Sequence, residues 1–451
     1  MKIKILSITV LIICLLIISQ TAPAQLPKET DAQKMQRMKW WTDARFGMFI
    51  HWGLYALPAR HEWVKNRERL TDSQYQKYFE NFNPDLYNPK EWAKMAKEAG
   101  MKYVVLTAKH HEGFCLWDSK FTDYKSTNTP VGKDLIKEYV EAFRAEGLKI
   151  GFYYSLIDWH HPDYTIDRNH PQRQDYDTAY ARLNKGKDMS RYREYMKNQV
   201  RELLTNYGEI SIIWFDFSFP GKNGKGHEDW DSENLLKLTR SLQPGIIVDD
   251  RLDLRDIEGG WDFTTPEQFK VTKWPEVNGK RVPWETCQTF SGSWGYYRDE
   301  TTWKSPAQLL ELLIESVSKG GNLLLNVGPT ARGTFDYRAQ DRLKAMGEWM
   351  RYNNRSIYAC TEAPEGITTP PNTLLTYNPL AKRLYVHMLA YPMGRLNLPG
   401  MADKVRYMQF LHDASEIRFT NGSGEEAGSI NVTLPVQKPS VEIPVLEIIL
   451  K

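Results

Sequence analysis

Residues 210–217 read Ile-Ser-Ile-Ile-Trp-Phe-Asp-Phe, an apolar and β-branched run that ends at an acidic residue, Asp216. Such a run is typical of a buried strand in a parallel sheet. Because an interior carboxylate without partners is costly, the surroundings of Asp216 must satisfy its charge. We therefore expect this carboxylate to stand at the rim of a strand, where it faces a ligand or caps the next helix.

Similar runs recur along the chain, and amphipathic stretches separate them. The other predicted strands are residues 46–52, 103–109, 149–155, 245–250, 261–267 and 321–328. The predicted helices are residues 89–100, 132–147 and 305–321, where each pattern closes with glycine. This alternation is expected of a parallel sheet or barrel.

Polar side chains follow nearly every predicted strand. They are His51, Lys109 to Glu112, Tyr153, Tyr154, Asp216, Asp249 to Arg251 and Glu267. In a (β/α)₈ barrel the active site lies at the carboxyl ends of the strands, although single residues there also cap strands or bind water. We therefore predict an α/β fold in which a (β/α)₈-like TIM barrel spans residues 35–352.

The pattern changes after the barrel, from about Ser356 onward. Short alternating segments follow, punctuated by Gly, Pro and Asn: residues 383–391, 404–412, 416–420, 430–434 and 441–450. Alternation of this kind predicts strands with one buried face. We expect residues 356–451 to form a small antiparallel β-sandwich packed directly on the barrel.

The first 24 residues have the pattern of a secretory signal peptide. Lys2 and Lys4 precede a predominantly apolar run over residues 5–18, and the small-residue stretch Ala22-Pro23-Ala24 follows. The apolar run is shorter than the roughly 20 residues that a membrane span needs. We expect cleavage near Ala24, export to the periplasm or the extracellular space, and no stable membrane insertion afterwards.

Charge and cysteine content narrow the classes of partner. The formal net charge is +3, and removing the two signal lysines leaves +1, so neither nucleic acid nor an anionic membrane is an expected partner. A neutral substrate fits this balance, and a homo-oligomer is compatible with it. Beyond the signal segment, Cys115, Cys287 and Cys360 are too widely spaced for a metal motif or a disulfide framework.

Two carboxyl groups on either side of a scissile bond are what glycoside hydrolysis requires. Asp216 is the first candidate, and Glu267, which ends the segment Trp-Asp-Phe-Thr-Thr-Pro-Glu, is the candidate acid/base. A first-turn helix position after Pro266 is the alternative explanation of Glu267 on local grounds. Glu285, in Pro-Trp-Glu-Thr-Cys, is the rival acid/base.

Three histidines raise the question of a metal site. His51, His110 and His111 lack a recognisable ligand spacing, and adjacent strand residues point to opposite faces unless both turn inward at the strand's end. Binding of substrate hydroxyl groups is therefore favoured over metal catalysis. A metal-dependent hydrolase and a non-catalytic sugar-binding protein are the alternative functions.

Further side chains suit a sugar site. The guanidinium of Arg251 can bridge two hydroxyls or steady a carboxylate. Trp63, Trp214 and Trp294 suit apolar walls, although core packing is the usual place of a tryptophan. The motif from Gly321 to Pro329 is interpreted as a late barrel strand without a catalytic part.

The chain resembles glycoside hydrolase family 29, the retaining α-L-fucosidases. The matching motifs lie in the same order at residues 44–53, 61–64, 107–114, 151–155, 214–216, 248–251, 261–263, 293–296 and 322–329. Two positions depart from the usual pattern of the family: His61 stands where Gly is more common, and Asp249 replaces a common Asn.

The resemblance implies a barrel followed by a β-sandwich, and hydrolysis of α-linked L-fucose from glycans without a metal or organic cofactor. It assigns Asp216 as the nucleophile, and Glu267 stands in a setting similar to the acid/base of the relaxed-specificity branch. The implied fucose subsite comprises His51, Glu62, Trp63, His110, His111, Trp214, Arg251, Trp294 and a tyrosine, for which Tyr153 is favoured over Tyr154.

Overall fold

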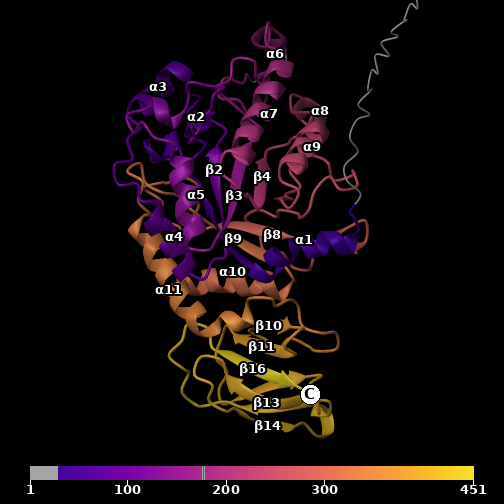
Figure 1. Cartoon of the computed structure of the whole chain (residues 1–451). Coiled ribbons are helices and arrows are strands. Elements are labelled where there is room, and N and C mark those ends of the chain that lie inside the picture. Colours follow the sequence, from indigo (N-terminus) through magenta and orange to yellow (C-terminus); the bar gives the residue numbers. More distant parts are fainter. Residues whose placement is uncertain (1–28, 175, 177) are drawn as a thin grey trace, which may run out of the picture.

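The computed structural model describes residues 29–174, 176 and 178–451, so the expected signal segment lies outside the described residues. Its largest element is a curled parallel sheet of seven strands in the order β5-β4-β3-β2-β1-β9-β8 (Figure 1). These strands are β1 Phe46–Ile50, β2 Tyr103–Lys109, β3 Lys149–Ser155, β4 Ile212–Asp216, β5 Ile247–Val248, β8 Glu285–Thr289 and β9 Asn322–Val327. The sheet gathers the carboxyl ends of its strands on one side.

An irregular segment, residues 261–267, occupies the gap between the edge strands β5 and β8. Phe263 makes a parallel bridge to Asp249 beyond β5, whereas Thr264 bridges Trp284 and Glu267 bridges Cys287 beside and within β8. The segment therefore takes the place of an eighth strand. Pro266 cannot donate a ladder hydrogen bond, which is one reason why this stretch does not pair as a regular strand.

Helices surround the sheet (Figure 1). They are α1 Asp31–Ala44, α2 Val64–Arg67, α3 Asp72–Glu80, α4 Pro89–Glu98, α5 Leu135–Ala145, α6 Thr178–Leu183, α7 Met189–Thr205, α8 His227–Trp230, α9 Ser232–Leu242, α10 Pro306–Ser318 and α11 Tyr337–Asn353. Local chemistry sets their starts: α10 begins with Pro306 after Ser305, whose hydroxyl accepts from the backbone of Gln308 in a capping box. None of the helices in the described part of the chain is long and apolar enough to cross a membrane.

Two antiparallel sheets follow the barrel, with strand orders β10-β11-β16-β13 and β12-β15-β14. Their strands are β10 Thr373–Asn378, β11 Arg383–Met388, β12 Arg395–Pro399, β13 Val405–Phe410, β14 Arg418–Asn421, β15 Ser429–Thr433 and β16 Val445–Leu450; a small hairpin of β6 Glu276–Val277 and β7 Lys280–Arg281 lies within the barrel region. These sheets have an apolar core of their own.

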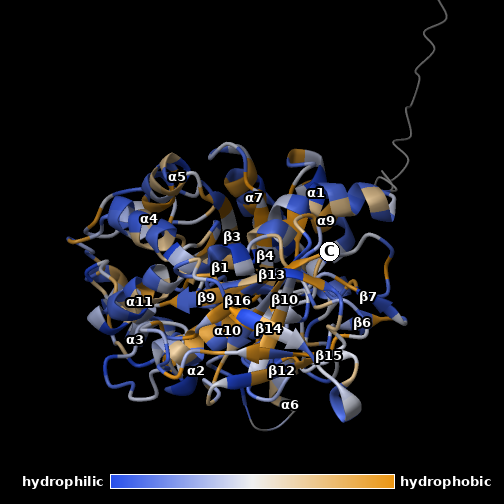
Figure 2. Cartoon of the chain, turned by 90° about the horizontal axis from the view of Figure 1, so that it is seen from below, coloured by the Kyte–Doolittle hydropathy of each residue, from blue (hydrophilic) through white to orange (hydrophobic). Residues whose placement is uncertain are grey.

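The β domain packs against the last barrel helices. The indole of Trp349 in α11 donates to the carbonyl of Ile443 (2.9 Å), just before β16. Seen from below, hydrophobic residues gather in the interior strands and along α10, whereas hydrophilic residues dominate the outer helices (Figure 2). Helix α10 contacts both β9 of the barrel and β10 of the β domain, and it lies between the two (Figure 1).

The predicted fold class, a barrel followed by antiparallel β structure, is confirmed. Six of the predicted strands correspond to β1, β2, β3, β4, β5 and β9, whereas residues 261–267 form single bridges instead of a strand. Strand β8 was not predicted, because its sequence Glu-Thr-Cys-Gln-Thr contains no apolar run. All of its residues are nevertheless buried.

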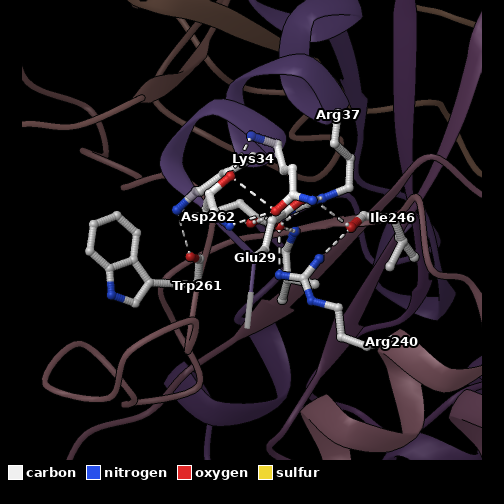
Figure 3. Close-up of polar contacts among 10 residues, drawn as sticks. Glu29, Lys34, Arg37, Arg240, Ile246, Trp261 and Asp262 are labelled. Carbon is white, nitrogen blue, oxygen red and sulfur yellow. Dashed lines mark hydrogen bonds and ion pairs between the residues drawn. The ribbon is translucent and has the colours of Figure 1, made fainter. Parts of the chain in front are cut away.

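A buried cluster of charges fastens the amino end of the irregular segment (Figure 3). Asp262 accepts two hydrogen bonds from Arg37 of α1 (2.7 and 3.1 Å) and one from Arg240 of α9 (2.8 Å), while Lys34 donates to the Trp261 carbonyl. Burial raises the pKa of Asp262, but these cations outweigh it and hold the pKa below its ordinary value. The cluster therefore ties α1 and α9 to the base of the segment that carries Glu267.

Candidate active site

A cavity opens at the carboxyl ends of the barrel strands. It is lined by Phe49, His51, Trp63, His110, His111, Tyr153, Trp214, Asp216, Phe217, Arg251, Glu267, Cys287 and Trp294. A larger hollow of about 620 Å³ lies beside the Asp262 cluster, but its partly buried arginines already pair with Asp262 and Glu29. The cavity at the strand ends is therefore the candidate active site.

Asp216, the last residue of β4, is the buried acid of this cavity. Its Oδ2 accepts a hydrogen bond from the Tyr153 hydroxyl (2.7 Å), and its Oδ1 accepts one from Arg251 (2.9 Å). Burial holds the pKa of Asp216 above its ordinary value and the charge of Glu267 adds to this rise, although the charge of Arg251 and the Tyr153 hydroxyl oppose it. The Tyr153 and Arg251 donors thus favour the ionised form of this carboxyl group, which is otherwise surrounded by apolar side chains.

Arg251 connects the two acidic residues of the cavity. One guanidinium nitrogen binds Asp216, and the other donates to Oε2 of Glu267 (2.8 Å). Its Nε donates to the Thr265 hydroxyl (2.9 Å), and its guanidinium lies over the ring of Trp214 at 4.4 Å. Glu267 stands at the mouth, with 39% of its side chain exposed, so it can meet both a bound ligand and water.

The histidines are held as neutral rings. Burial lowers the pKa of His51 to about 3 and lowers the pKa of His111 well below its ordinary value. The Nδ1 atoms face the side-chain oxygens of Asn326 (2.6 Å) and Ser155 (2.7 Å), so each ring donates there and its Nε2 remains an acceptor. Neutral rings of this kind are suited to accept hydrogen bonds from ligand hydroxyl groups.

His110 and His111 both line the cavity because β2 ends at Lys109, and the alternation of a strand no longer applies to them. Burial lowers the pKa of His110, and its Nδ1 is buried without a hydrogen-bond partner. Within the described residues, no three or more His, Cys, Asp or Glu side chains form a group that could hold a metal ion.

Aromatic rings form the wall beside Asp216. Phe217 has a φ of 85°, which is rare for a bulky residue, and this backbone conformation turns its ring into the cavity. The ring contacts Trp63 and His111 at centroid distances of 5.3 and 5.1 Å. Trp294 closes another side and lies 5.1 Å from His51.

Three of the proposed site residues lie outside this lining. The Tyr154 hydroxyl donates to Gln199 (2.8 Å), so it is Tyr153 that meets Asp216. Glu62 accepts from the backbone of Trp294 (3.1 Å) and Gly295 (2.9 Å), so it supports the loop that carries Trp294. Burial raises the pKa of Glu62 to about 7.

Glu285, the other candidate acid/base, is the third proposed site residue that lies outside the cavity lining. It is the first residue of β8, fully buried, and bonded to Trp41 and Tyr103 at the amino ends of the strands. Glu267 is therefore the carboxylate that shares Arg251 with Asp216.

Several residues of the site were missed by the sequence analysis. Phe49, Phe217 and Cys287 line the cavity, while Asn326, Ser155 and Thr265 hold His51, His111 and Arg251. A polar residue within an apolar strand, such as Asn326 in Asn-Leu-Leu-Leu-Asn-Val, was the available signal. That motif had been interpreted as structural only.

Comparisons with known proteins agree on one family. The α-L-fucosidase family model matches residues 14–355. The chain is similar to an α-L-fucosidase from Dictyostelium discoideum, with 32% identity over 350 residues, 71% of each protein. It is also similar to the structure of α-L-fucosidase isoenzyme 1 from Paenibacillus thiaminolyticus, with 44% identity and a TM-score of 0.87 over 93% of this chain and 99% of that chain.

A second structural relative is an α-L-fucosidase from Bacteroides thetaiotaomicron, with 28% identity and a TM-score of 0.79 over 95% of this chain and 98% of that chain. Its structure is described as a trapped covalent intermediate with 2-fluoro-fucosyl fluoride.

Proposed function

The chain belongs to the α-L-fucosidase family of glycoside hydrolases, and on that premise we propose that it releases terminal α-linked L-fucose from glycans with retention of configuration. The observation that carries this proposal is the guanidinium of Arg251, which binds Asp216 and Glu267 at once. One carboxylate is buried among apolar rings and the other is open to the cavity mouth.

The bridging guanidinium supports the retaining mechanism. Retaining glycosidases keep their two carboxyl groups about 5 to 5.5 Å apart, whereas inverting enzymes need about 6.5 to 9.5 Å to admit a water between sugar and base. A guanidinium shared by both carboxyl groups is compatible with the shorter of these separations. This arrangement suits direct attack by Asp216 on the sugar.

In the proposed double displacement, Asp216 attacks the anomeric carbon while Glu267 donates a proton to the departing glycosidic oxygen. The C–O bond to the leaving group breaks and a fucosyl ester forms on Asp216. Glu267, now ionised, removes a proton from water, which attacks the same carbon and releases fucose. Two inversions give net retention.

The proposed sugar subsite uses the neutral histidines as acceptors for fucose hydroxyls. His51 and His111 offer the Nε2 atoms of their rings, that of His111 being 3.9 Å from Oδ2 of Asp216, and Phe217 with Trp63 offers an apolar surface for the methyl group or a ring face. Glu62, whose Oε1 lies 3.0 Å from Nδ1 of His61, joins the proposed subsite through the backbone of Trp294, from which its other oxygen accepts. A fucosylated glycan is thus the proposed partner.

Export is a separate proposal. It rests on Lys2, Lys4, the apolar run over residues 5–18 and the Ala22-Pro23-Ala24 stretch. We propose cleavage near Ala24 and a periplasmic or extracellular enzyme. Mass spectrometry of the protein from cell fractions should find a chain that starts close to Gln25 outside the cytoplasm, and a cytoplasmic chain that keeps residues 1–24 would refute export.

Replacement of Asp216 by Asn should abolish turnover while the shape of the side chain is kept. We expect kcat on an aryl α-L-fucoside to fall roughly 1,000-fold or more, because an amide cannot form the ester intermediate. The thermal midpoint of the variant is the control for folding. In the wild-type enzyme, proton NMR should show α-L-fucose as the first-formed anomer, and β-L-fucose formed first would exclude retention.

Replacement of Glu267 by Gln should affect substrates according to their leaving groups. With a substrate whose leaving group departs without protonation, the rate of the first step should fall little. With a natural glycan the rate should fall about 100-fold or more, because general acid catalysis is worth about 10²–10⁴-fold. Steady-state kinetics on both substrates measures the difference. Equal losses on both substrates would remove Glu267 from the acid/base role.

Replacement of Tyr153 by Phe should move the acidic limb of the kcat/KM profile to higher pH. Its hydroxyl lowers the pKa of Asp216, and activity falls as the pH drops through that pKa because a protonated carboxyl cannot attack. The matched control is Tyr154→Phe, since that hydroxyl binds Gln199 instead. An unchanged acidic limb in Tyr153→Phe, or the same shift in both variants, would contradict this assignment.

A further inference from the structure

Glu285 is a buried carboxyl group that the proposed mechanism does not use. It is fully buried at the amino end of β8, two residues before Cys287, which lines the cavity. Because side chains alternate along a strand, Glu285 and Cys287 point to the same interior face, one layer apart. Glu285 therefore lies beneath the floor of the active site.

Two donors from two elements bond to this carboxyl. The Trp41 indole of α1 donates to Oε2 (3.2 Å), and the Tyr103 hydroxyl of β2 donates to the same oxygen. Trp41, Tyr103 and Trp214 belong to one buried cluster, and the indole N–H of Trp214 lowers the pKa of Glu285. Oε1 of Glu285, an acceptor, and Nε1 of Trp214, a donor, are both buried, and neither has a hydrogen-bond partner.

Trp214 in turn forms the floor on which the active site rests. It lies in β4 two residues before Asp216, and its ring stacks on Tyr153 at 5.9 Å with an interplanar angle of 19°. It also contacts the ring of Phe49 at 5.3 Å and the guanidinium of Arg251, 4.4 Å from the ring centroid. Tyr153 and Arg251, two of the residues that contact Trp214, are the donors that hold Asp216.

We propose that Glu285 is a positioning residue, which orients the Trp214 indole and through it the Arg251 guanidinium that joins Asp216 to Glu267. The inference rests on the proposed roles of Asp216 and Glu267. Glu285 does not line the cavity, so in this proposal it acts on the reaction through Trp214.

The chemistry of the site explains why a carboxyl is needed there. A carboxylate can accept from all of its neighbours, because it offers two oxygens and no hydrogen. An amide offers one oxygen, and its NH₂ group would face the indole N–H of Trp214 or the Trp41 and Tyr103 donors. Burial raises the pKa of Glu285 to about 7 against the pull of these donors.

The test is the variant Glu285→Gln, with Glu202→Gln as the matched control. Glu202 is another buried carboxyl that accepts from an indole, Trp117 (2.9 Å), but it lies in α7 and its other oxygen binds the backbone of Lys120. We expect Glu285→Gln to lower kcat/KM roughly 10- to 100-fold, the scale of a small misplacement of catalytic groups. Glu202→Gln should keep the wild-type value.

The acidic limb of the kcat/KM profile distinguishes a positioning role of Glu285 from a role in protein stability alone. The charge of Arg251 lowers the pKa of Asp216, so a displaced Arg251 should shift that limb to higher pH in Glu285→Gln. Should Glu285→Gln fail to fold, Tyr103→Phe removes one donor with little change in volume and should shift the limb in the same direction. A folded variant with wild-type kcat/KM and acidic limb, or an equal effect in Glu202→Gln, overturns the proposal.

A crystal structure of Glu285→Gln gives a readout that does not depend on activity. The proposal expects Trp214 to turn and the guanidinium of Arg251 to move off its ring, whereas an unmoved pair overturns the proposal. Absence of fucoside hydrolysis by the wild-type enzyme would instead contradict the proposed function and leave this structural comparison decisive for Glu285.

Discussion

The bridge made by Arg251 is the interaction on which the active site depends. Two carboxylates in a largely apolar cavity repel one another and lose hydration, and a single guanidinium with two outward nitrogens satisfies both. The backbone has to bring Asp216 from β4, Arg251 from the loop after β5 and Glu267 from the irregular segment to one point. Much of the barrel can be understood as the scaffold for this convergence.

The irregular segment 261–267 is the part of the scaffold that departs most from a regular barrel. The ion pairs of Asp262 hold its lower end, and the single bridge between Glu267 and Cys287 holds its upper end. Between them, Thr265 binds Arg251 and Asp250. A short stretch with few ladder bonds can thus place a carboxylate at the cavity mouth, because ion pairs fix its lower end and a backbone bridge fixes its upper end.

Sequence patterns predicted the parts of the fold that rest on local chemistry. Apolar runs gave β1 to β5 and β9, and acidic or aromatic residues at their ends gave most of the cavity. The same reasoning missed β8, because Glu-Thr-Cys-Gln-Thr is buried by its neighbours and not by its own hydrophobicity. It follows that Glu285 could not be placed from sequence, since its depth depends on where β8 begins.

Which of several candidate side chains enters the cavity depends on three-dimensional geometry that local sequence patterns do not indicate. Tyr153 and Tyr154 are equivalent in composition, and only the facing of β3 shows that one meets Asp216 and the other Gln199. His110 and His111 share the cavity because they lie just beyond the end of β2. The inward turn of Phe217 follows from a positive φ that nothing in the residue itself suggests.

The proposed mechanism requires a covalent bond between Asp216 and the sugar. Covalent labelling of the enzyme tests for this bond directly. A 2-fluoro-fucosyl fluoride of the kind that trapped the Bacteroides thetaiotaomicron relative should slow breakdown of the intermediate. Proteolysis and tandem mass spectrometry of the labelled wild-type enzyme are predicted to find one fluorofucosyl group on Asp216. A label on another carboxylate, or active enzyme that is never labelled, would contradict the account.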